Sequence, residues 1–64
     1  MSHQTVLSEY FTEMHKIATS VLQQYEQLAQ SANNPELQDQ FDRLSRDEYK
    51  QVQLTERLIE ILEE

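Results

Sequence analysis

One stretch of the sequence decides the fold: Ser31-Ala32-Asn33-Asn34-Pro35-Glu36. Asn is a favoured helix N-cap, Pro is favoured at the first helical position, and Glu in the first turn complements the helix dipole. We therefore expect Asn34 to cap a second helix over about residues 35–62. We also expect Asn33 to take the left-handed conformation that ends a first helix over about residues 4–32. The sequence thus predicts a single all-α hairpin of two antiparallel helices over residues 1–64, with its loop at 33–34.

The composition of the 64 residues excludes most other folds and several chemistries. The sequence contains no Gly and no Cys, so it has no phosphate-binding Gly loop, no Asn-Gly hairpin turn, no disulfide and no thiolate metal site. Five Lys or Arg residues against twelve Asp or Glu residues give a net charge of −7, which disfavours nucleic acids and anionic membranes as partners. No apolar run approaches the roughly 20 residues of a membrane span, and no leader pattern is present, so we expect a soluble intracellular protein.

Apolar residues recur in both predicted helices at alternating steps of four and three, which is a heptad pattern. In the first helix the pattern comprises Leu7, Phe11, Met14, Ala18, Val21, Tyr25, Leu28 and Ala32. In the second helix the ends of the pattern are apolar and its middle is polar: Leu37, Phe41, Leu44, Glu48, Gln51, Thr55, Leu58 and Leu62. Further apolar residues flank both patterns, among them Tyr10, Ile17, Leu54 and Ile61.

These apolar stripes are wider than a two-helix hairpin can cover, so each is expected to face more than one neighbour. A chain of this size buries only about 60% of its unfolded surface as a monomer. We therefore expect two copies to form an antiparallel four-helix bundle. The residues expected to form its core and dimer pairing are Phe11, Met14, Ala18, Val21, Tyr25, Leu44, Glu48, Gln51, Thr55 and Leu58.

Glu48 needs a physical reason at a core position, because a buried carboxylate costs several kcal/mol unless it is paired, neutralised or bound to a metal. One interpretation is a polar layer, in which Glu48 hydrogen-bonds Gln51 or a tyrosine and fixes the pairing of helices. A second is a metal or ligand site, and a third is a solvent-exposed side chain. In ferritin-like di-iron bundles the corresponding tetrad is Glu-x-x-His. Here it is Glu48-Tyr49-Lys50-Gln51, with glutamine in place of histidine.

Four short motifs follow one another between Val21 and Leu62: Tyr25-x-x-Leu28-Ala29-x-x-Ala32, Asn34-Pro35-Glu36-Leu37, Phe41-x-x-Leu44 and Asp47-Glu48. In these motifs the chain resembles the small ferritin-like hairpins of the spore coat F group of spore-forming Gram-positive bacteria, whose frame is similar to that of rubrerythrin-type proteins. The resemblance implies a dimer that forms a ferritin-like four-helix bundle. The family pattern has Glu where this chain has Ala18 and His where it has Gln51, so the resemblance does not carry over a di-iron site.

A different metal site is an open alternative. In a symmetric dimer, two Glu48 and two His15 side chains could gather near the axis and bind Fe, Mn or Zn through oxygen and nitrogen ligands. His15 lies on the flank of the apolar stripe, however, which favours a partly exposed histidine over a ligand. Apart from this alternative, no cofactor is expected.

The function expected from the sequence is that of a non-enzymatic structural or interaction protein. It would act as a homodimeric helical bundle, be cytoplasmic or spore-associated, and have a second copy and other coat or partner proteins as its partners. No catalytic residue is expected, because two uninterrupted helices offer neither a nucleophile turn nor an oxyanion hole. The alternatives are a metal-binding or oxidative-stress protein using Glu48 and His15, and a small acidic inhibitor or adaptor of a basic protein.

Overall fold

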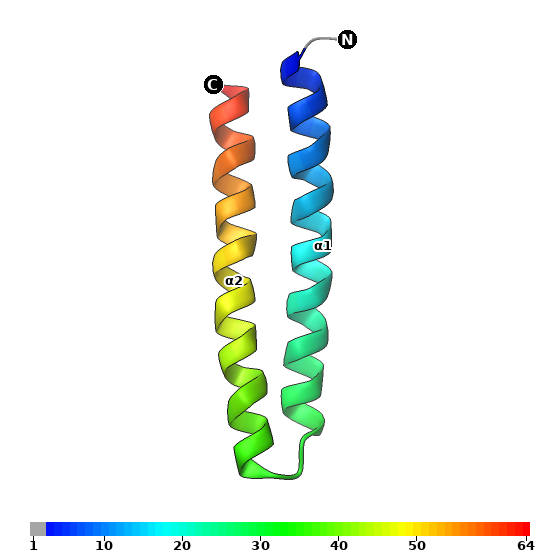
Figure 1. The fold of residues 1–64 in the computed structure, drawn as a ribbon, viewed down its shortest axis with the longest axis vertical. Coiled ribbons are helices and arrows are strands. Elements are labelled where there is room, and N and C mark those ends of the chain that lie inside the picture. Colours follow the sequence, from blue (N-terminus) through cyan, green and yellow to red (C-terminus); the bar gives the residue numbers. More distant parts are fainter. Residues whose placement is uncertain (1–2) are drawn as a thin grey trace.

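The computed structural model describes residues 3–64 as a helical hairpin (Figure 1). Helix α1 spans His3–Ser31 and helix α2 spans Pro35–Glu63, each of 29 residues, and no strand is present in this part of the chain. Each boundary lies within one residue of its expected position. Both helices run without interruption, because neither contains Gly and the only Pro stands in the first turn of α2, where its missing N–H costs nothing.

Asn34 begins α2 as predicted. Its backbone is extended, with φ −118° and ψ 123°, and its side-chain oxygen accepts hydrogen bonds from the backbone N–H groups of Glu36 at 2.9 Å and Leu37 at 3.1 Å. These bonds satisfy two of the donors that a helix start leaves free.

The prediction that Asn33 is left-handed is wrong, since no residue within 3–64 has a positive φ. Helix α1 instead ends with a backbone hydrogen bond of 3.0 Å, which the Ala32 N–H donates to the Leu28 carbonyl. Leaving the helix in this way avoids the cost of a left-handed backbone at a residue with a Cβ.

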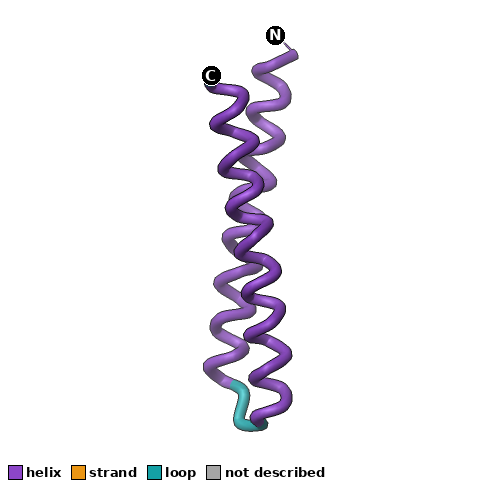
Figure 2. Tube along the Cα trace, turned by 90° about the vertical axis from the view of Figure 1, so that its left-hand side faces the viewer, coloured by secondary structure: helices purple, strands orange, loops and turns teal. Residues whose placement is uncertain are grey.

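The two helices form one thin layer, with Cα extents of 50 × 15 × 10 Å. The helices lie side by side along their whole length (Figure 1). The view turned by 90° shows that they cross at a shallow angle (Figure 2). Within residues 3–64 no third element covers either side of this layer. Neither helix is long and apolar enough to cross a membrane, a finding that holds for the described residues.

The residues buried or half-buried between the helices form a heptad pattern that we call the seam. It shares Phe11, Ala18, Tyr25 and Ala32 with the predicted pattern of the first helix. It also shares Phe41, Glu48, Thr55 and Leu62 with the predicted pattern of the second helix. The other members are shifted by one residue toward the C-terminus, so that polar or small side chains replace several large ones. The full seam is Ser8, Phe11, His15, Ala18, Leu22, Tyr25 and Ala29 in α1, Ala32 in the loop, and Phe41, Ser45, Glu48, Val52, Thr55, Ile59 and Leu62 in α2.

The hydrophobic core of the hairpin is small. The buried apolar residues are Ala18, Ala29 and Val52, and Thr55 is the buried polar one. Among the described residues no large side chain is fully buried. Alanines at the seam let the two helix backbones approach each other, but they contribute little apolar area, so packing within one hairpin stabilises it only weakly.

Candidate interaction surface

One side of the hairpin is apolar along its length. Its residues are Leu7, Met14, Val21 and Leu28 in α1, and Leu37, Leu44, Gln51 and Leu58 in α2, and all of these except Leu37 directly precede a seam residue. Because the helices are antiparallel and face each other through their seams, these two flanks lie on the same side of the layer. Together with the adjoining Tyr10, Ile17, Leu54 and Ile61, they form a surface that we call the apolar face.

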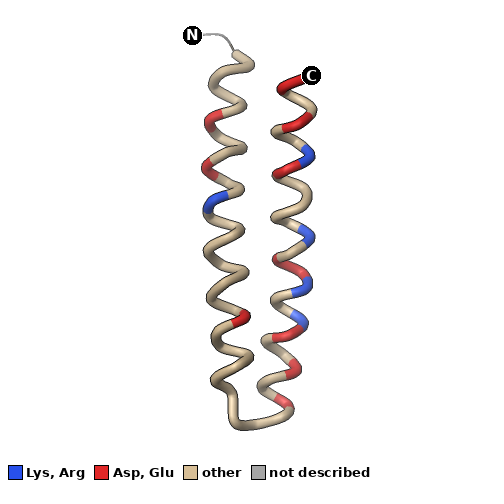
Figure 3. The backbone as a smooth tube through the Cα atoms, turned by 180° about the vertical axis from the view of Figure 1, so that it is seen from behind, with Lys and Arg blue, Asp and Glu red and all other residues tan. Residues whose placement is uncertain are grey.

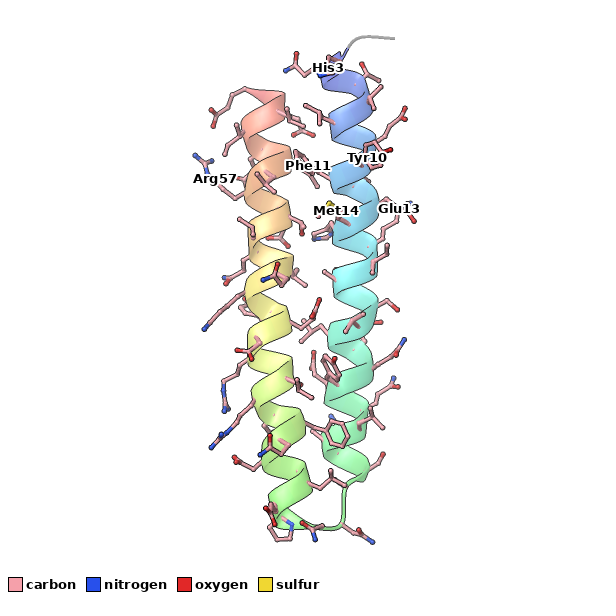
Figure 4. All side chains as sticks on the ribbon, in the orientation of Figure 1. His3, Tyr10, Phe11, Glu13, Met14 and Arg57 are labelled. Carbon is pink, nitrogen blue, oxygen red and sulfur yellow. The ribbon has the colours of Figure 1, made fainter. Side chains whose placement is uncertain are left out.

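Most large side chains of the apolar face are open to solvent. Tyr10 is 66% exposed, Ile17 57% and Met14 48%, and the leucines Leu7, Leu28, Leu37 and Leu44 are also exposed. Figure 4 shows Phe11 and Met14 on the side of α1 nearer to α2, whereas Glu13 and Arg57 point away from the neighbouring helix. Single exposed apolar residues are ordinary, but a contiguous stripe of them marks an interaction site.

Charged residues lie mainly away from the apolar face. None of the eight flanking positions that define it is charged, and α1 carries charge only at Glu9, Glu13, Lys16 and Glu26. In Figure 3 α1 is therefore mostly tan, whereas acidic and basic residues are spread along α2.

The ion pairs on the outer surface are exposed. Each pair lies within a single helix: Arg43 is 3.3 Å from Asp39, Arg57 is 3.2 Å from Glu60, and Lys16 is 4.0 Å from Glu13. Such pairs contribute only tenths of a kcal/mol. The charged positions outside the apolar face thus form a solvated exterior.

A groove of about 220 Å³ lies at the middle of the apolar face, and we call it the central groove. Its walls are formed by Met14, Ile17 and Ala18 of α1 and by Glu48, Gln51 and Thr55 of α2. Because both helices line one groove, their two flanks lie on the same side of the layer. The small side chain of Ala18 leaves this space open. The structure therefore brings together five of the residues predicted to form the core and dimer pairing.

The polar groups of the central groove differ in their hydrogen bonding. The Thr55 hydroxyl is bonded within its own helix, at 3.1 Å from the Gln51 carbonyl and 2.8 Å from the Val52 carbonyl. Within residues 3–64, the side chains of Glu48 and Gln51 have no hydrogen-bond or ion-pair partner. Glu48 is half-buried, and its carboxylate has no protein partner among these residues.

The other predicted pairing residues are divided between the seam and the apolar face. Phe11, Val21, Tyr25 and Leu58 are half-buried, whereas Leu44 is 40% exposed. Phe11 and Tyr25 belong to the seam within one hairpin. Val21, Leu44 and Leu58 belong to the apolar face.

His15 is a seam residue that contacts Glu56 of α2. Its Nε2 lies 3.2 Å from Oε1 of Glu56, with the two side chains 31% and 56% exposed. The structure therefore pairs His15 with Glu56, and within residues 3–64 it holds no group of three or more His, Cys, Asp or Glu side chains arranged for a metal ion. A metal site made of Glu48 and His15 from two copies stays a prediction.

A second, more polar groove of about 660 Å³ was not anticipated from the sequence. It lies on the side of the layer opposite the apolar face, where Leu22 and Glu26 of α1 meet Asp42, Arg46 and Tyr49 of α2. No sequence signal identifies it, because its charged residues have the spacing of an ordinary solvated helix surface.

Comparison of this chain with protein-family models, with curated proteins and with solved structures finds no match.

Proposed function

We propose that this chain is a non-enzymatic structural or interaction protein that acts as a homodimer, in which two hairpins meet through their apolar faces and form a four-helix bundle. The observation that supports it most is the distribution of side-chain size. The buried apolar residues are Ala18, Ala29 and Val52, while large apolar residues such as Ile17 and Leu44 stay exposed on one side. A ferritin-like bundle and association with a spore coat, which the resemblance implies, belong to the same proposal.

The surface area supports a partner of about the size of a second hairpin. The accessible surface of the chain is 5051 Å² at a mass of 7.6 kDa. A globular monomer of that mass exposes roughly 4,300 Å². The excess of roughly 750 Å² is close to the ~800 Å² that each partner buries in a stable protein–protein interface.

A second copy is a suitable occupant, because the apolar face matches itself. It spans both helices, is apolar near both ends and is polar at its middle. Two such faces can therefore bury apolar against apolar residues and polar against polar residues. Apart from Glu48 in the central groove, most charged residues of each copy stay on the outer surfaces, in contact with water.

The proposal predicts a dimer that a single charge on the apolar face disrupts. Ile17→Glu would bury an unpaired carboxylate in the interface, at a cost of several kcal/mol, so we expect its dimer dissociation constant to rise by about a hundredfold or more. Ser20→Glu is the matched control, because Ser20 is exposed on the same helix but outside the apolar face. Sedimentation equilibrium measures both variants.

Two outcomes contradict the proposal. One is a stable folded monomer of the unaltered chain at micromolar concentration. The other is an equal effect of Ile17→Glu and Ser20→Glu on dimerisation. A dimer also gives a melting temperature that rises with protein concentration, which provides a second measurement on the unaltered chain.

The half-buried, unpartnered carboxylate of Glu48 favours one alternative, a metal-binding or oxidative-stress protein. In this alternative Glu48 and His15 of two copies hold Fe, Mn or Zn. Metal analysis of protein purified without a histidine tag tests it. Protein that retains no metal and shows no thermal shift on addition of Fe(II), Mn(II) or Zn(II) contradicts it.

A further inference from the structure

We infer that the second copy docks antiparallel to the first, about a two-fold axis that is perpendicular to the helices and passes through the central groove, so that Gln51 of each copy hydrogen-bonds Glu48 of the other. The inference rests on the dimer proposed above and adds its orientation, its register and the residues that determine them.

The first step concerns the polar groups that a second copy covers. The Glu48 carboxylate is half-buried and the Gln51 amide is exposed on the same groove, and neither side chain has a partner within residues 3–64. Once covered, each group needs a hydrogen bond, because an unpaired buried carboxylate costs several kcal/mol. The Thr55 hydroxyl already donates within its own helix, so the amide N–H groups of Gln51 are the donors that the groove offers to Glu48.

The second step compares the two possible symmetric orientations. A two-fold axis parallel to the helices would place Glu48 of both copies at the same level of the bundle, with two carboxylates facing each other. A perpendicular axis reverses the second hairpin. With the axis between the levels of Glu48 and Gln51, each carboxylate then lies at the level of the other copy's amide. Charge therefore favours the antiparallel orientation.

The third step concerns length. Glu48 and Gln51 flank the midpoint of α2, which spans Pro35–Glu63. Reversal about that level keeps the two hairpins in contact over their whole length. It also sets the apolar residues near the loop, such as Leu44, against those near the C-terminus, such as Leu58. A polar layer elsewhere in the helix would leave one end of each apolar face uncovered.

Spin labels on single cysteines measure this orientation, and the natural sequence has no Cys to interfere. We choose Glu9→Cys, Gln23→Cys and Gln30→Cys, which are exposed and share one heptad position of α1. At 1.5 Å per residue, the antiparallel dimer separates the two labels along the axis by about 30 Å for positions 9 and 30, but by only about 10 Å for position 23. Double electron–electron resonance should therefore give a clearly shorter distance for Gln23→Cys than for the other two.

Equal distances at all three positions would overturn the antiparallel orientation and leave the dimer standing. A monomer in sedimentation would instead overturn the dimer. For the hydrogen bond, Gln51→Glu should weaken the dimer about tenfold or more, and the exchanged pair Glu48→Gln with Gln51→Glu should restore it. An unchanged dimer in Gln51→Glu, or no recovery in the exchanged pair, would overturn the Glu48–Gln51 contact.

Discussion

At the scale of single residues, Glu48 is the one half-buried acid among residues 3–64. It is half-buried in a groove that also contains Met14, Ile17 and Ala18. We predict that Glu48→Leu combined with Gln51→Leu raises the melting temperature, because apolar side chains in place of both polar groups remove the cost of burying them. The same change should broaden the distribution of oligomers, since the polar layer no longer selects one pairing. Thermal melts and sedimentation velocity check both parts, and loss of folding in this double variant would contradict the first.

The candidate site could be predicted in part at this scale. Ala18, Glu48 and Thr55 belong both to the predicted heptad pattern and to the observed seam, and the structure places them on one groove. The position of His15 could not be predicted in the same way. The partner of His15 depends on the length of the loop, because loop length sets which residues of the two helices lie at the same level. The loop comprises residues 32–34 instead of the expected 33–34. The structure accordingly places His15 beside Glu56.

At the scale of the helices, the boundaries follow from local chemistry and the seam does not. Asn34 and Pro35 define the start of α2 through capping bonds that the sequence predicts directly. The seam was expected at the largest apolar residues, such as Met14 and Leu44, but within one hairpin it runs one residue further, through His15 and Ser45. A wide apolar stripe contains two neighbouring heptad patterns, and spacing alone does not say which of them faces the partner helix.

The helix start offers a direct test of capping. Asn34→Ala removes the acceptor of two backbone N–H groups, so we expect the free energy of unfolding to fall by about 1 kcal/mol. Asn33→Ala is the matched control, since Asn33 is also in the loop but is not the N-cap. Chemical denaturation at fixed protein concentration measures both. Equal losses in the two variants would contradict a specific role for the cap.

At the scale of the whole molecule, the shape of the hairpin favours association of two copies, whereas its net charge opposes association. A layer with Cα extents of 50 × 15 × 10 Å exposes much surface for its mass, and the apolar face concentrates the excess on one side. Association through that face would add the core that the hairpin lacks. Each copy also carries a net charge of −7, so two copies repel each other. In the proposed dimer, folding and association are coupled, because only the folded hairpin presents the apolar face.

This balance predicts how salt acts on the dimer. The exposed charges outside the apolar face repel between copies, and salt screens them over a Debye length of about 10 Å at 0.1 M and about 3 Å at 1 M. As NaCl increases from low ionic strength, we therefore expect the dimer dissociation constant to fall and the melting temperature to rise. Sedimentation equilibrium at several salt concentrations measures the effect. A dimer that salt weakens would instead indicate ion pairs between the copies, and the apolar face would then not be the main source of its stability.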